Sequence, residues 1–138
     1  MLQAEPRTRT HAVAEIMVHD HQSTAVDVSA EPALSQLRLE EGFTGEMEGE
    51  SSVLALQVKL GDRSAHMVSM QRFRGKLGGR EGSFVLQGSE IIEQGKISAK
   101  WSVVPGSGTG QLSGLRGEGG FEGDFGKGST GTLDYWFE

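Results

Sequence analysis

The chain contains no cysteine, so disulfide bonds, thiolate metal ligands and a cysteine nucleophile are all excluded. Only 3 prolines accompany 21 glycines, a balance that indicates tight turns within a defined fold and not a linker. No apolar run approaches the roughly 20 residues of a membrane-spanning helix. The N-terminus also lacks the basic region and apolar run of a secretion signal. We therefore expect a cytoplasmic protein that does not bind membranes.

Basic residues are scarce as well: 13 Lys and Arg face 19 Asp and Glu, which gives a formal charge of -6. Binding to a nucleic-acid backbone requires clustered Lys and Arg, so we expect no nucleic-acid partner. The chain of 138 residues is 36% apolar before its glycines are counted, which is enough to build the core of one domain. We expect a single domain over residues 1–138, with residues 1–10 forming a loosely ordered N-terminus.

Helical periodicity is also missing, whereas alternation of apolar and polar residues recurs along the chain. In the clearest strand, Ile97, Ala99, Trp101 and Val103 alternate with polar residues. We interpret residues 23–32 as a connection or a poorly paired segment and expect Ser51-Ser52 to break the strand register. The alternation predicts about eight strands, within residues 15–21, 37–50, 54–60, 65–77, 83–92, 96–103, 111–117 and 133–137.

Close spacing of the turn signals predicts an antiparallel meander, either a closed barrel or a sandwich. We favour an all-β class with a single antiparallel eight-stranded barrel. The reason is that Gly45, Gly49 and Gly75 fall on the inward face of their strands. Glycine at such positions allows the sharp coiling that closure of a barrel requires.

A glycine-dense loop follows the strand that ends at Val103 and Val104. It does not match a phosphate-binding loop, because Gly126-Lys127 is followed by Gly128 and not by Ser or Thr. A dinucleotide-binding fingerprint fails as well, since Gln111 stands where the third glycine is needed. We interpret the loop as a set of structural turns and expect no cofactor.

Two histidines flank an aspartate in His19-Asp20-His21, a pattern from which zinc could be ligated. The third and fourth ligands cannot be named, so we expect solvated histidines and no metal. Serine is plentiful, but no Gly-x-Ser-x-Gly elbow lies between a strand and a helix. A hydrolase triad is therefore not predicted.

Candidate ligand contacts are the polar and aromatic residues on the inward face of the predicted strands. A carboxylate in an apolar cavity has a raised pKa and can act as an acid or base, which makes Glu41 our candidate catalytic residue. The competing interpretation is that Glu41 is wet or hydrogen-bonded at an open barrel end. We interpret Glu90 as exposed, because it lies near a strand end. The candidate cavity residues are Glu41, Phe43, Gln71, Phe73, Trp101 and Tyr135.

Six blocks distributed over nearly the whole chain carry a family resemblance: FTGEMEGE (43–50), RFRGKL (72–77), GSFVLQ (82–87), WSVVPGSGTG (101–110), LSGLRGEGG (112–120) and LDYWFE (133–138). Together they resemble a bacterial family known as domain of unknown function 3224. That family is similar in fold to the allene oxide cyclase barrel, which plant dirigent proteins also use. The resemblance implies a calycin-like barrel with an apolar cavity, and a homo-oligomer, dimer or trimer. It implies no reaction, because the family has no established activity.

Three functions are compatible with these features. Our leading hypothesis is a barrel that binds a small apolar molecule, as lipocalins do. The first alternative is a cyclase or isomerase acting on a hydrophobic substrate in the cavity. The second alternative is a structural or interaction protein with a packed barrel, in which Trp136 belongs to a subunit interface. The sequence leaves open whether the protein is an enzyme.

Overall fold

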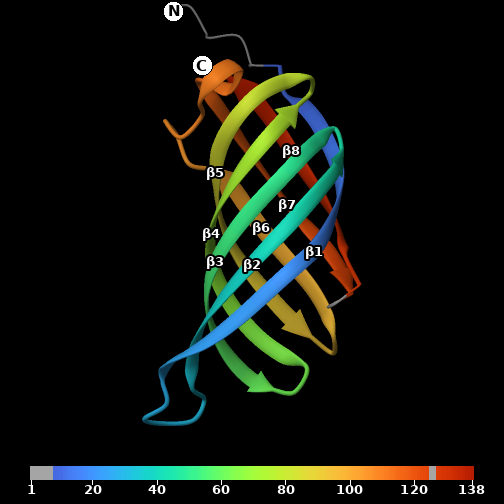
Figure 1. Ribbon diagram of the computed structural model, residues 1–138. Helices are drawn as coiled ribbons and strands as arrows, with labels where there is room; N and C mark the ends of the chain where they lie inside the picture. Colours follow the sequence, from blue (N-terminus) through green and yellow to red (C-terminus); the bar gives the residue numbers. More distant parts are fainter. Residues whose placement is uncertain (1–7, 125–126) are drawn as a thin grey trace, which may run out of the picture.

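The computed structural model describes residues 8–124 and 127–138, so the expectation for residues 1–10 falls mostly outside the described residues. The strands form one closed barrel in the order β1 to β8, and β1 returns to pair with β8 (Figure 1). The predicted eight-stranded antiparallel barrel is thereby confirmed. The strands are β1 (Thr10–Asp27), β2 (Leu34–Gly45), β3 (Met47–Gly61), β4 (Ser64–Leu77), β5 (Arg80–Glu93), β6 (Lys96–Val103), β7 (Leu115–Asp124) and β8 (Ser129–Phe137).

The barrel has two ends, which differ in the connections they carry (Figure 1). We call the end with the β2–β3 turn, the β4–β5 turn and the C-terminus the upper end. The lower end carries the β1–β2, β3–β4 and β5–β6 turns. No helix among the described residues is long and apolar enough to cross a membrane.

Gly49 and Gly75 face each other across β3 and β4, and both have positive φ, at 158° and 152°. A Cβ atom on either residue would collide with the backbone oxygen of the opposite strand, that of Arg74 or of Glu48. The two backbones therefore approach more closely here than side chains would permit. This matches the coiling role that the sequence suggested for inward glycines.

Two predicted strand boundaries are wrong. The chain turns between β2 and β3 at Glu46, whereas Ser51-Ser52 lies inside an uninterrupted β3. This turn could not be recognised in the sequence, because the turn is short and the odd-numbered residues face inward on both strands. The buried Phe43 and Met47 show this parity. The glycine at position 45, with φ of 120°, allows the sharp reversal.

The first strand is longer than predicted, because residues 23–27 continue β1 and pair with the start of β2. A register shift between Val18 and Asp20 disturbs the alternation, so the segment looked like a connection in the sequence. Pairing between β1 and β8 extends only as far as Ile16 opposite Ser129. The rest of β1 therefore projects with β2 as a hairpin at the lower end (Figure 1).

The glycine-dense loop between β6 and β7 closes the upper end of the barrel. It contains a short 3-10 helix, η1 (Gly110–Leu112), which places Leu112 in the core with no exposed surface. The amide of Thr109 donates to the carbonyl oxygen of Ser83 at 2.9 Å, which holds the loop against β5. The predicted structural turns are present, and they act as a lid over the core.

Candidate functional site

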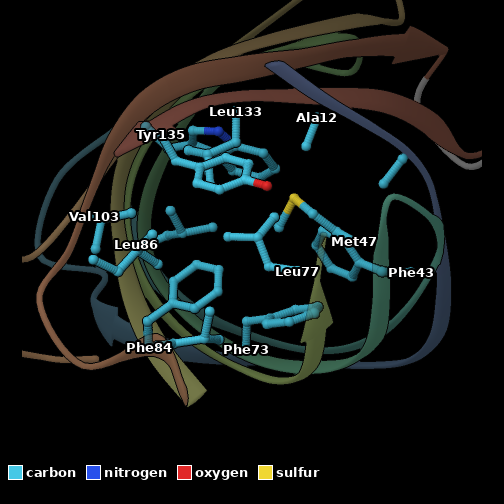
Figure 2. Close-up of a cluster of buried hydrophobic side chains, with 14 of the residues drawn as sticks. Ala12, Phe43, Met47, Phe73, Leu77, Phe84, Leu86, Val103, Leu133 and Tyr135 are labelled. Atoms are coloured by element: carbon cyan, nitrogen blue, oxygen red, sulfur yellow. The ribbon is translucent and has the colours of Figure 1, made fainter. Parts of the chain in front are cut away.

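The upper half of the barrel is filled by apolar side chains. Figure 2 shows Phe73, Phe84, Leu86 and Met47 pointing into the barrel interior. The rings of Phe73 and Phe84 have centroids 5.1 Å apart, and neither residue is exposed. None of the four described pockets is lined by any of these four residues.

Four of the six predicted cavity residues lie in this packed half. The rings of Phe43 and Phe73 meet edge to face with centroids 5.3 Å apart, and Phe43 stacks on Trp101 at 6.4 Å. The indole Nε1 of Trp101 donates to the carbonyl oxygen of Thr132 at 2.9 Å. Tyr135 belongs to the same core and is 7% exposed. Their role in ligand binding stays a prediction.

The other two predicted residues, Glu41 and Gln71, belong to a group of inward polar residues below the aromatic core. In this group the hydroxyl of Ser51 donates to Oε1 of Gln71 at 2.7 Å, and the hydroxyl of Ser69 donates to Oε2 of Glu90 at 2.8 Å. Buried polar groups are tolerated when they are hydrogen-bonded in this way. We call this group the polar belt: Glu41, Ser51, Ser69, Gln71 and Glu90.

The two carboxyl groups of the belt differ in their contacts. Glu90 is only 6% exposed and accepts the hydrogen bond from Ser69. Glu41 is partly exposed, and the described part of the chain gives its carboxyl no hydrogen bond and no ion pair. Both oxygens of the Glu41 carboxyl are thus free of protein partners within the described residues.

Burial and, as the smaller cause, the negative charge of Glu90 together raise the pKa of Glu41 to about 7. Burial also raises the pKa of Glu90, to about 6, against the opposing effect of the Ser69 hydrogen bond. Near neutral pH at least one of the two carboxyls therefore holds a proton for part of the time. The pair can then both donate and accept a hydrogen bond inside the barrel.

The lower half of the interior has a smaller buried apolar cluster, which includes Met67 and Ile92, and beside it small or partly exposed residues. Ala55 and Ala99 face inward here, and Gly88 stands between Leu86 and Glu90 on the inward face of β5. The inward side chains of Leu37 and Ile97 are partly exposed, although they lie on the concave face of the sheet. Leu37 also lines a pocket at the lower end, so packing in this half leaves space at the mouth.

A pocket of about 480 Å³ forms the lower mouth of the barrel. Its apolar floor includes Leu37, Ala65 and Ile92, of which Ile92 is the next inward residue after Glu90 on β5. Turns at the lower end form its rim. The volume lies within the range of about 300–1,000 Å³ that small-molecule sites occupy.

A second hollow is lined mainly by outward residues of the sheet, although the inward Ser69 and Trp101 also line it. Its volume is about 1040 Å³, and its wall includes Leu54, Leu56, Val68 and Met70. These four outward side chains are 43%, 44%, 58% and 51% exposed. Leu54 pairs with Met70 and Leu56 with Val68 across β3 and β4, so the four form one exposed apolar cluster.

Sequence reasoning missed part of this site. The expectation that Glu90 is exposed is wrong: the side chain is buried, because β5 continues to Glu93 and is flanked on both sides by β4 and β6. Glu90 lies at an even spacing from Phe84 and Leu86 and so shares their face of the strand, which was the signal for an inward side chain. Ser51 and Ser69 were missed as belt members, since a serine in an alternating strand carries no sign of its burial.

The His19-Asp20-His21 segment lies on the projecting part of β1, where all three residues are exposed. No group of three His, Asp or Glu side chains suited to a metal ion occurs within residues 8–124 and 127–138. The ring of His19 packs over Gly42 of β2, where a Cβ would collide with it.

Comparison with known proteins places the chain in a family. The model of a protein family of unknown function, DUF3224, matches residues 12–138. A crystal structure of a DUF3224 family protein of unknown function from Shewanella oneidensis MR-1 is similar, with 30% sequence identity and a TM-score of 0.71. The similarity covers 94% of this chain and 98% of that one. No curated protein matches the chain. The chain belongs to the DUF3224 family.

Proposed function

We propose that the lower half of the barrel binds a small, largely apolar molecule. One observation carries the proposal: inward side chains are fully packed in the upper half, whereas the lower half combines a smaller buried apolar cluster with polar and partly exposed inward side chains next to a pocket. An open interior next to a rigid apolar core is typical of a pre-formed ligand site. The apolar floor of the mouth would contact the body of the ligand, and the polar belt would bind its polar group.

Within this site Glu41 is the residue best able to form new hydrogen bonds to a ligand. Its carboxyl has no partner among the described residues, and its pKa of about 7 lets it donate or accept a hydrogen bond at neutral pH. A ligand hydroxyl or carbonyl would supply the missing partner. Gln71 is already bonded to Ser51, so it would contribute less.

The experiment that tests the proposal is an NMR titration with 1-octanol, a neutral probe with an apolar chain. We expect amide shifts at the inward positions of the lower half and none around Phe73 and Phe84. Native mass spectrometry of freshly purified protein would reveal a retained natural ligand as extra mass. Shifts scattered over the outer surface, or no shifts at all, would refute the proposal.

A filling variant sharpens this test. Ala99→Leu places a larger side chain between Glu90 and Phe121, its cross-strand neighbours on the inner face. We expect octanol affinity to fall about tenfold or more because the space is taken. Ser98→Leu, on the exposed outer face of the same strand, is the matched control and should bind octanol as the wild type does.

Proton-transfer catalysis of the isomerase type is the second candidate, favoured by the unpartnered Glu41 carboxyl. A general acid or base works best when its pKa lies near the working pH, as that of Glu41 does. Exchange of the α-hydrogens of 2-octanone in heavy water would reveal such transfer. We expect Glu41→Gln to abolish any exchange but to weaken octanol binding only slightly, because the Gln amide can still hydrogen-bond the hydroxyl. Exchange that survives the substitution would reject the role.

A homo-oligomer with an allene oxide cyclase-like barrel remains our proposal for the assembly. The exposed apolar cluster at Leu54, Leu56, Val68 and Met70 supports it, since contiguous exposed apolar patches often mark protein interfaces. Trp136, the interface residue suggested by the sequence, is half-buried, with the guanidinium of Arg9 4.3 Å from its ring centroid. Sedimentation velocity of the wild type and of Leu56→Ser tests this, and a wild-type monomer would reject it.

A further inference from the structure

The rim of the lower mouth differs in charge from the rest of the molecule. The chain as a whole carries a formal charge of -6. The pocket lining, in contrast, contains four basic side chains, Lys59, Arg63, Lys96 and Lys127, against the two acidic ones Asp62 and Asp124. A local excess of positive charge on an acidic protein creates an attractive region for anions at one place.

The four basic residues converge from separate parts of the fold. Lys59 lies near the end of β3, Arg63 in the β3–β4 turn, Lys96 at the start of β6 and Lys127 between β7 and β8. These connections meet at the lower end of the barrel (Figure 1). The cationic rim is therefore a product of barrel closure and is not visible as a charge run in the sequence.

The rim cations are largely free of carboxylate partners. The Arg63 guanidinium donates to the carbonyl oxygen of Gln94 at 2.7 Å, which leaves its charge unneutralised. Lys96 lies 3.6 Å from Asp124, and both side chains are well exposed. Within the described residues no carboxylate lies within ion-pair distance of Lys59 or Lys127. The rim can therefore accept an anion without breaking a strong ion pair.

The interior above the rim determines which end of such a ligand enters. Leu37, Ala65 and Ile92 offer apolar surface directly inside the mouth. The carboxyls of Glu41 and Glu90 lie deeper, where an anionic head group would meet like charge in a region of low dielectric. An anion with an apolar chain would therefore leave its head group at the rim and place its chain inside.

We propose that the ligand of the lower half is an amphipathic carboxylate, whose head group is held at the mouth by Lys59, Arg63, Lys96 and Lys127. This inference rests on the proposed binding function and adds the chemical class of the ligand. The apolar floor accounts for the chain and the basic rim for the carboxylate. The acidic belt sets the direction of entry.

Three probes with the same apolar chain test the inference by isothermal titration calorimetry: octanoate, 1-octanol and octylammonium. We expect octanoate to bind about tenfold more tightly than octanol, and octylammonium more weakly than either. The octanoate affinity should fall as salt rises from about 0.02 M to about 0.5 M, while that of octanol should not.

Each other outcome has a definite meaning. Octanol binding as tightly as octanoate would overturn the carboxylate inference and leave the proposed binding function intact. If octylammonium bound most tightly, the inference would be overturned too, because the belt carboxyls would then attract the head group more strongly than the rim cations do. If none of the three probes binds, the proposed function itself fails, and the inference with it.

Variants of the rim complete the experiment. The triple variant Lys59→Gln, Arg63→Gln and Lys127→Gln should lose about tenfold in octanoate affinity but less than about twofold in octanol affinity. The matched control removes three cations from the outer face of β4, Arg72→Gln, Arg74→Gln and Lys76→Gln, with the same change in net charge. Equal losses in the two triple variants would assign the effect to overall charge and refute the rim.

Discussion

The upper and lower halves of the barrel continue the same sheet, yet their interiors are built from different side chains. Above, Phe73, Phe84 and Leu112 are completely buried and held under a lid. Below, a smaller cluster around the buried Met67 and Ile92 lies beside small residues, two carboxyls and partly exposed aliphatic residues. One half therefore supplies most of the buried apolar area, and the other keeps space and polar groups.

This division explains how a chain of 138 residues can keep an open interior. A barrel of eight strands can be filled by side chains or can hold one small ligand. Here the aromatic cluster fills the upper part and stabilises the closed sheet. The lower part can then be packed less densely. Looser packing lowers the stability of the fold but leaves room for a ligand.

The largest expected effect is on the stability of the upper half. Phe73→Ala should lower the free energy of unfolding by about 3–5 kcal/mol, because it leaves a cavity among fully buried rings. Leu39→Ala, at a partly exposed inward position of the lower half, should cost about 1–2 kcal/mol. Urea denaturation measures both. Equal losses would contradict the proposed difference between the halves.

The sequence predicts the upper half well because packing leaves a strong pattern. Inward aromatic residues alternate with polar ones along each strand, so Phe43, Phe73, Trp101 and Tyr135 could be placed in the interior before their neighbours were known. Whether that interior is filled depends on volumes summed over eight strands. No local pattern contains this information, and the sequence left the open and packed barrels undecided.

The lower half is harder to predict, because its features come from different strands. Glu90 pairs with Ser69 from the neighbouring strand, and the rim cations come together only when the barrel closes. The turn at Glu46 was missed although it is local in the sequence. The alternation of apolar and polar residues continues through it without a break, so nothing in the pattern marks the turn.

The polar belt makes stability depend on pH. The folded pKa values of Glu41, about 7, and Glu90, about 6, lie above the ordinary value of 4.5, so the folded state holds protons that the unfolded state releases. Stability is therefore highest below about pH 4.5 as far as these groups are concerned, falls as the pH rises, and levels off above about 7.

Removing the charge of one carboxyl tests this dependence. Glu41→Gln should stabilise the protein at pH 8 by about 2 kcal/mol and flatten the decline in stability between pH 5 and about 8. Glu48→Gln, at an exposed outer position of β3, is the matched control and should keep the wild-type slope. Chemical denaturation at several pH values measures both. An unchanged slope in Glu41→Gln would show that the belt carboxyl is hydrated like a surface group.

A smaller effect is expected from the hydroxyl that faces Glu90. Ser69→Ala removes the 2.8 Å hydrogen bond that stabilises the Glu90 carboxylate, so the pKa of Glu90 should rise by about 1. Carboxyl carbon NMR titration follows this residue directly. Ser51→Ala, which removes the bond to Gln71 instead, should leave the pKa of Glu90 unchanged. A similar change in both variants would mean that hydration of the belt, and not the hydrogen bond, sets this pKa.

The smallest effect is expected outside the barrel, where apolar side chains resemble those of the core in type but not in burial. Leu56→Ser, at a side chain that is 44% exposed, should change the free energy of unfolding by less than about 0.5 kcal/mol in dilute solution. Leu86→Ser, at a fully buried inward position, should cost several times more, because it buries a hydroxyl among apolar neighbours and leaves a cavity. Urea denaturation at low protein concentration measures both. A loss for Leu56→Ser as large as that for Leu86→Ser would mean that the outer cluster is covered in the stable form of the protein. The stability of the protein would then depend on assembly as well as on the packed upper half.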